Sequence, residues 1–243
     1  MPSLRDAGKI TGPLSIRDQA KACNFGFPLS LRDFIVGPGC PFNRFVRLHV
    51  KMLQQPTLDL DPMFRAMRTI YARAGIRVEL ASTEDLTGPA FATLLDIDVG
   101  ECLLGQTPTA EQSQLFANRA NAGGNDVVVY FVRTVTYFDP TLNNGAGGTG
   151  TLNGCASHPN GQPGAVVAQT ATPLTMAHEV GHVLGLRHFD PSVTCGASYS
   201  TNRLMTKCFL GNGSDAVLIQ SEIDRMMSSN FTQAGFEFSG GGA

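Results

Sequence analysis

The first regular pattern in the chain is an alternation of apolar and polar residues over positions 46–52. A period of two is typical of a half-buried β-strand, with one face in the core and one in solvent. His49 falls on the polar face, so we expect its side chain to be solvated. A second alternation covers residues 76–80 and predicts another strand.

Between these two strands the apolar residues recur at helical spacing. Asp61 and Pro62 suit the N-cap and first position of a helix, and Gly75 suits its end. The pattern therefore predicts a helix over residues 61–74. Strand, helix and strand in sequence predict a parallel pair of strands joined by a right-handed crossover.

The middle of the chain has weaker signals. Residues 81–108 carry no clear pattern and are assigned no element. Thr109 suits the cap of a helix running to about residue 121. Residues 127–132 form a continuous apolar run, typical of a strand covered on both faces, and the Gly-, Asn- and Thr-rich residues 139–154 predict a loop.

One strand and two helices are predicted in the last third. Residues 164–169 predict a short strand, and Thr172 and Pro173 suit the cap and start of a helix directly after it. His158 lies in the preceding Pro- and Gly-rich loop and is interpreted as an ordinary surface histidine. Ser214 or Asp215 suits the cap of a last helix. Its apolar positions include Val217, Ile223, Met226 and Met227.

The composition is that of a compact globular protein. Of 243 residues, 42% are hydrophobic and only 16% are charged, which argues against a largely disordered chain. No apolar run approaches the ~20 residues of a membrane span. The net charge of −2 gives no electrostatic basis for binding nucleic acid or an anionic membrane. We therefore expect no membrane span, no nucleic-acid partner and a monomer.

The terminal segments and the cysteines indicate how the chain is processed and in which cellular compartment it resides. Residues 1–43 are rich in Gly and Pro and are interpreted as an N-terminal extension or pro-segment, which lacks the apolar stretch of a signal peptide. Residues 239–243 predict a disordered tail. Six cysteines without a CxxC pair favour disulfides, and so a secreted protein in an oxidising compartment. Six free thiols in a cytosolic protein are the alternative.

An eleven-residue stretch, HEVGHVLGLRH, carries the candidate chemistry. His178 and His182 lie four positions apart, so on a helix both imidazoles face the same side and can share a metal ion, for which zinc is the usual choice. Glu179 can act as a general base beside the open coordination position without being a ligand. Gly185 can adopt the positive φ that ends a helix and returns His188 as a third ligand. The stretch predicts one zinc ion per chain; the alternative is a polar helix face with solvated histidines.

This stretch resembles the zinc signature of the metzincin metallopeptidases. That family also has a Met-turn, for which Met205 is the candidate. The resemblance implies an α+β catalytic domain over residues 44–238 with a zinc cleft between two subdomains. A twisted mixed sheet with long helices would form the N-terminal subdomain, residues 44–185. A small irregular C-terminal subdomain with a terminal helix would cover residues 186–238.

The resemblance also implies how a substrate is held. In metzincins the strand before the active helix is an edge strand above the cleft, which makes Ala165, Val166 and Val167 the candidate substrate-binding edge. The pocket beside the Met-turn is mostly apolar in this family, so an apolar residue is expected after the scissile bond. Phe189, which follows the third histidine, matches none of the subfamilies considered, so the subfamily stays open.

The Met-turn suggests one pairing of the six cysteines, which sequence alone could connect in fifteen ways. Cys195 and Cys208 flank the Met-turn and are the candidate disulfide that holds it, with Cys102–Cys155 and Cys23–Cys40 for the remaining four. A zinc-bound cysteine from residues 1–43 that keeps the enzyme latent is an alternative for the last pair.

Together these features predict a zinc-dependent endopeptidase that hydrolyses peptide bonds in extended protein segments. A zinc-bound water activated by Glu179 would attack the scissile carbonyl. The alternatives are a non-catalytic zinc-fold binding module and an intracellular peptidase or toxin with free thiols. Oxygens of Asp139, Asn143 and Asn144 are conceivable calcium ligands, but without EF-hand spacing they do not support a calcium site.

Overall fold

The computed structural model describes residues 44–103, 105–140, 146–193, 195, 201–208 and 216–234. The interpretations of residues 1–43 and 239–243 lie outside the described residues. So do those of Cys23, Cys40, Asn143, Asn144, Ser214 and Asp215. The boundaries of the domain and its subdomains stay predictions.

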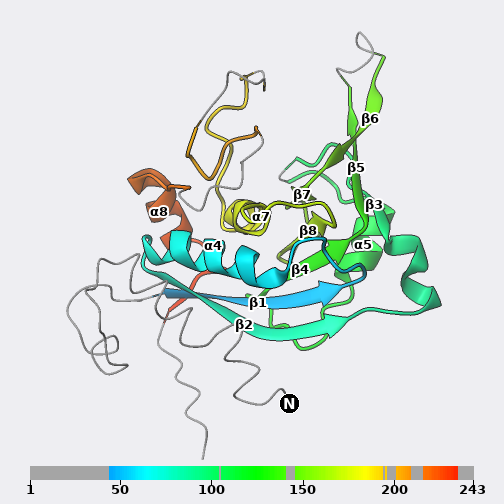
Figure 1. The fold of residues 1–243 in the computed structure, drawn as a ribbon, viewed down its shortest axis with the longest axis horizontal. Coiled ribbons are helices and arrows are strands. Elements are labelled where there is room, and N and C mark those ends of the chain that lie inside the picture. Colours follow the sequence, from blue (N-terminus) through cyan, green and yellow to red (C-terminus); the bar gives the residue numbers. More distant parts are fainter. Residues whose placement is uncertain are drawn as a thin grey trace, which may run out of the picture.

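A mixed six-stranded sheet forms the centre of the molecule (Figure 1). Its strands run in the order β2-β1-β4-β8-β7, and β9 also pairs with β1. The strands β1, β2, β4 and β8 are parallel, whereas β7 and β9 run antiparallel to their partners. Their bounds are β1 Arg44–Met52, β2 Ile76–Asp85, β4 Val127–Val132, β7 Gly154–Cys155, β8 Gly164–Ala168 and β9 Gln233–Ala234.

Two helices, α4 (Leu60–Ala72) and α7 (Thr175–Val183), cover one face of this sheet (Figure 1). Their apolar residues and those of β1, β4 and β8 form one buried cluster. The fully buried Tyr71 joins the helices, since its hydroxyl donates to the carbonyl of Ala177 over 2.8 Å. The parallel β1–α4–β2 unit confirms the predicted strand, helix and strand.

A second, three-stranded sheet contains β3 (Asp96–Asp98), β5 (Thr134–Asp139) and β6 (Gly148–Leu152), in the order β3-β5-β6. Strands β5 and β6 form an antiparallel arm that projects from the main sheet at the upper right of Figure 1. The predicted loop over residues 139–154 is therefore wrong, because it contains β6 and reaches β7. The glycines there serve close packing: a Cβ at Gly150 would overlap the ring of Tyr137 on the neighbouring strand.

The opposite face of the main sheet packs against a second apolar cluster. This cluster includes residues of the 3₁₀-helix Pro89–Leu94 and of α5 (Ala110–Phe116). Thr109 caps α5 as predicted, because its Oγ1 accepts from the Gln112 N–H over 3.1 Å. The helix ends at Phe116, earlier than the predicted residue 121.

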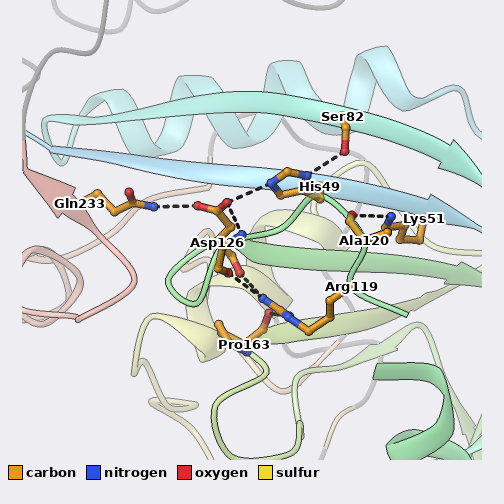
Figure 2. A network of polar contacts seen from close by, with 9 residues as sticks. His49, Lys51, Ser82, Arg119, Ala120, Asp126, Pro163 and Gln233 are labelled. Carbon is orange, nitrogen blue, oxygen red and sulfur yellow. Dashed lines mark hydrogen bonds and ion pairs between the residues drawn. The ribbon is translucent and has the colours of Figure 1, made fainter. Parts of the chain in front are cut away.

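Strand β1 is buried on both faces, which corrects the prediction for His49. His49 is only 3% exposed; its Nδ1 lies 2.7 Å from Ser82 Oγ and its Nε2 lies 3.1 Å from Asp126 Oδ2 (Figure 2). Lys51 on the same face is fully buried and donates to the Ala120 carbonyl over 2.9 Å (Figure 2). Strand β2 supplies Ser82, and the segment that follows α5 supplies Ala120 and Asp126, so these polar side chains are buried in hydrogen bonds rather than solvated.

Strand β8 is not a sheet edge, so the predicted substrate-binding edge is wrong. It pairs with β4 on one side and with β7 on the other, where Val166 lies opposite Cys155 and Val167 opposite Gly154. Ala165, too, is fully buried. The edge position belongs to β7, which the sequence pattern had placed in a loop.

The last two helices begin later than predicted. The N–H of Thr172 donates to Thr175 Oγ1 over 3.0 Å, so a turn precedes α7. Helix α8 (Gln220–Met227) begins after Ile219, and Val217 lies before it in a bridge to Arg203. No helix within the described ranges is both long and apolar enough to cross a membrane.

Candidate metal centre

Helix α7 and the turn after it bring three histidines together. His178 and His182 lie on α7, which ends at Val183. Gly185 has φ of 96°, a left-handed conformation that favours glycine. The chain then turns back and presents His188 to the other two histidines, which form the only possible metal-ligand group found among the described residues.

The Nε2 atoms of His178, His182 and His188 are each 3.1 Å from the other two. Each Nδ1 of the helical pair lies near a carbonyl oxygen: 2.7 Å from Leu204 for His178 and 2.9 Å from Leu186 for His182. A carbonyl only accepts, so those Nδ1 atoms carry the protons and the Nε2 atoms are bare. Converging lone pairs repel unless a cation lies between them, and tetrahedral zinc with bonds of about 2.0–2.1 Å would separate its nitrogen ligands by about 3.3 Å. The donor set therefore fits zinc.

Burial keeps these imidazoles neutral. It lowers the pKa of His178 to about 4 and that of His182 to about 3. Burial also lowers the pKa of His188, although the nearby Asp190 carboxylate acts in the opposite direction. Only a neutral imidazole can bind a metal, so all three are in the binding form at neutral pH.

Glu179 is buried next to the histidines and lines the same cavity. Burial raises the pKa of its carboxyl to about 8. Its position depends on a glycine in the edge strand: a Cβ at Gly154 would lie 2.7 Å from Glu179 Cγ and 3.0 Å from Cδ. The sequence analysis missed Gly154, since no local signal links it to a residue 25 positions later.

Met205, the Met-turn candidate, is fully buried and lies against α7. A Cβ at Gly181 would lie 2.9 Å from its Sδ, so a glycine on the helix admits the methionine. Asp190 holds the residues that follow Met205. Its Oδ2 accepts from Thr206 Oγ1 over 2.7 Å, and its Oδ1 accepts from the Lys207 N–H over 2.9 Å. Asp190 was not singled out from the sequence.

Two disulfides stand on opposite walls of the site. Cys195–Cys208 closes the segment around Met205, with a Cα–Cα distance of 5.3 Å. Cys102–Cys155 joins the turn after β3 to strand β7, with a Cα–Cα distance of 5.9 Å. These are two of the three predicted pairs; the third, Cys23–Cys40, lies outside the described residues.

A cavity of about 1110 Å³ connects these parts. It is lined by the three histidines and Glu179, by residues 151–154 and 156–157 around β7, by residues 206–208, and by Leu103 and Tyr137 near the arm. In Figure 1 the arm and the described residues after α7 rise on opposite sides of that helix. Helix α7 contributes His178, Glu179 and His182 to the lining of this cavity, which is called the cleft below.

His158 does not belong to this site and is not an ordinary surface residue. It is half-buried, with its ring centroid 6.5 Å from that of Phe116 and 6.3 Å from that of Phe231. Burial lowers its pKa. The surface interpretation is wrong because the ring is packed between two aromatic side chains.

Residues 65–233 match the family described as Metallo-peptidase family M12B Reprolysin-like. A search of curated proteins found no match.

Two solved structures are similar to this chain. Metalloproteinase-II from Bacteroides fragilis is 16% identical with a TM-score of 0.47, and the match covers 77% of this chain and 54% of that one. Archaemetzincin from Methanopyrus kandleri is 15% identical with a TM-score of 0.40, over 75% of this chain and 94% of that one. This chain thus spans about half the length of the Bacteroides protein.

Proposed function

The chain belongs to the M12B reprolysin-like metallopeptidases, and on that basis we propose that it is a zinc-dependent endopeptidase that cleaves extended segments of proteins. Its α+β fold is metzincin-like, and its peptidase family implies a catalytic metal. We propose three further points: that the enzyme cuts within chains, that the residues below have the roles given, and that the substrate segment is extended. The observation that carries it is the convergence of the Nε2 atoms of three histidines beside a buried carboxyl group in a long cleft.

Zinc would be held by His178, His182 and His188, one ion per chain. The main-chain partners of the first two support this role, because they fix the tautomer that leaves Nε2 free. The bound ion would act as a Lewis acid on the scissile carbonyl and make a water molecule more acidic.

Glu179 is the proposed general base. It would take a proton from the attacking water and later deliver that proton to the nitrogen of the departing amine, so the carboxylate is regenerated. Burial supports this role, because it raises the pKa of the carboxyl group to about 8, close to neutral pH. A cation in the histidine site would favour the ionised form that the first step requires.

Strand β7 is the proposed binding edge for the substrate main chain. The carbonyl of Asn153 accepts from the Ala168 N–H over 2.8 Å, so it points toward β8. Main-chain groups alternate in direction along a strand, and those of Gly154 therefore point away from β8. Gly154 also lines the cavity beside Glu179. A peptide pairing there would be extended and would pass the metal centre.

The size of the cleft supports a peptide substrate. Pockets for small molecules measure roughly 300–1,000 Å³, and this cavity holds about 1110 Å³. The two disulfides support an oxidising compartment and hence a secreted enzyme.

The test uses denatured casein and peptides with blocked ends. Wild type should cleave both at internal bonds and should lose activity when a chelator removes zinc. Glu179→Ala should retain zinc and lose activity by roughly 10²–10⁴-fold or more. Release of single terminal residues only, abolished by blocking, would contradict the endopeptidase proposal, and zinc binding without any cleavage would favour a binding module.

A further inference from the structure

Leu103 is an exposed apolar side chain inside the cleft. It is 56% exposed, and it lines the same cavity as the three histidines. Single exposed leucines are common on protein surfaces and need no explanation alone. Here the neighbouring Cys102 is bonded to Cys155, which ties the backbone beside Leu103 to the edge strand.

The adjoining face of the arm is also apolar. In the β5–β6 register Val135 lies opposite Leu152 and Tyr137 opposite Gly150, so these four residues share one face. Tyr137, Leu152 and Val135 line the cavity with Leu103. Gly150 adds no side chain of its own and leaves the ring of Tyr137 flat against the strand. The result is an apolar wall at one end of the cleft.

Covalent connections limit the distance between this wall and the metal centre. Leu103 is one residue from Cys102, whose Cα lies 5.9 Å from that of Cys155. Gly154 is the next residue toward the site and contacts Glu179. With about 3.8 Å between consecutive Cα atoms, Leu103 and Gly154 are at most about 14 Å apart. An extended peptide covers this distance with about four residues at roughly 3.3 Å each.

We propose that the wall formed by Leu103, Tyr137 and Leu152 is a substrate subsite that binds an apolar side chain within about four residues of the scissile bond. The inference rests on the proposed endopeptidase function and adds a specificity determinant to it. A peptide paired with β7 and continued toward the arm reaches this wall. Glu101, exposed beside the disulfide, lines the same end of the cavity, so an acidic side chain is disfavoured there.

The experiment compares Leu103→Asp with a matched control, Phe138→Asp. Phe138 is also exposed, at 46%, and lies on β5 next to Tyr137, but it faces the other side of the arm and does not line the cavity. The probe is an end-blocked peptide of about ten residues built around the best cleavage site in denatured casein. Each position of this peptide is substituted in turn with Leu and with Asp.

At one position within about four residues of the cleaved bond, wild type and Phe138→Asp should prefer Leu over Asp by about tenfold in kcat/KM. Leu103→Asp should reduce that preference to within about twofold and leave the other positions unchanged. Equal preference in Leu103→Asp and wild type would overturn the subsite. A preference lost equally in Phe138→Asp would do the same, because it would reflect damage to the arm.

A second readout separates this inference from the proposed function. If wild type cleaves no casein, the endopeptidase proposal fails, and the subsite is then tested by anisotropy of labelled denatured casein on zinc-loaded Glu179→Ala protein. Binding weakened about tenfold by the added Leu103→Asp change, and not by Phe138→Asp, supports the subsite. Absence of binding, or binding that is indifferent to Leu103→Asp, refutes it.

Discussion

Replacing Gly154 with alanine tests how the edge strand positions the proposed base. The added Cβ would lie 2.7 Å from Glu179 Cγ and 3.0 Å from both Cδ and Oε1. Carbon atoms in van der Waals contact are about 3.5–4.0 Å apart. Either the strand or the glutamate must therefore move by about 1 Å.

The glutamate should move rather than the strand. β7 is paired with β8, and the next residue, Cys155, is bonded to Cys102. The glutamate side chain has three rotatable bonds and no comparable anchor. A displacement of about 1 Å in a reacting group costs on the order of 100-fold in rate, so we expect Gly154→Ala to lower kcat by roughly that factor.

Stability and metal content should change far less. Gly154 has no positive φ, so alanine fits the backbone, and a strand gains about 0.5–1 kcal/mol from this replacement. Overpacking costs about 1–3 kcal/mol. The net loss corresponds to a Tm decrease of a few degrees. Zinc should remain stoichiometric, because Glu179 is not one of the proposed ligands.

The assay combines peptide hydrolysis, zinc analysis and thermal unfolding. Gly124→Ala is the matched control, since a Cβ at Gly124 meets nothing within 4 Å and its φ is not positive. The control should behave as wild type in all three measurements. A Gly154→Ala enzyme whose kcat stays within about threefold of wild type would refute the reasoning that this strand positions Glu179.

Further predictions concern the metal ligands and the segment after them. His182→Ala should lose zinc and activity together; stoichiometric zinc in this variant at sub-micromolar free metal would remove His182 from the ligand set. In zinc-free protein the pKa values of His178 and His182, about 4 and 3, lie below the ~6.5 of an exposed histidine, so the unfolded state binds more protons. Stability should therefore fall as the pH drops from about 6.5 toward 4, seen as a decreasing urea midpoint, and His182→Ala should show a smaller decrease; equal decreases would contradict this assignment. Asp190→Ala should cost about 1–3 kcal/mol in urea unfolding, because the Thr206 hydroxyl loses its buried acceptor, and an unchanged midpoint would show that water replaces the carboxylate.

The sequence was most informative where the relevant residues are close together in the chain. The histidine spacing and the position of Gly185 follow from helix geometry within eleven residues, and the structure brings the three histidines together as expected. Local geometry sufficed for these features because helix periodicity aligns His178 with His182 and the positive φ of Gly185 turns the chain back toward them.

Contacts between distant residues could not be predicted in this way. His49 was expected in solvent, but its partners Ser82 and Asp126 are 33 and 77 positions away. The glycines of β6 indicated a loop, whereas one of them leaves room for the ring of Tyr137 across the hairpin. That error hid β7, which takes the edge position that the family resemblance had assigned to β8. Glycine composition does not distinguish a turn from a close approach between strands.

The hydrogen bonds that orient His178 and His182 go to main-chain carbonyl oxygens, those of Leu204 and Leu186. Every amino acid carries such a carbonyl, so the side chains at these two positions are free to serve the core, where both are buried. Apolar replacements of similar volume usually cost less than about 1.5 kcal/mol. The sequence at positions 186 and 204 can therefore drift with the packing of the core, while the tautomers of the two histidines stay the same.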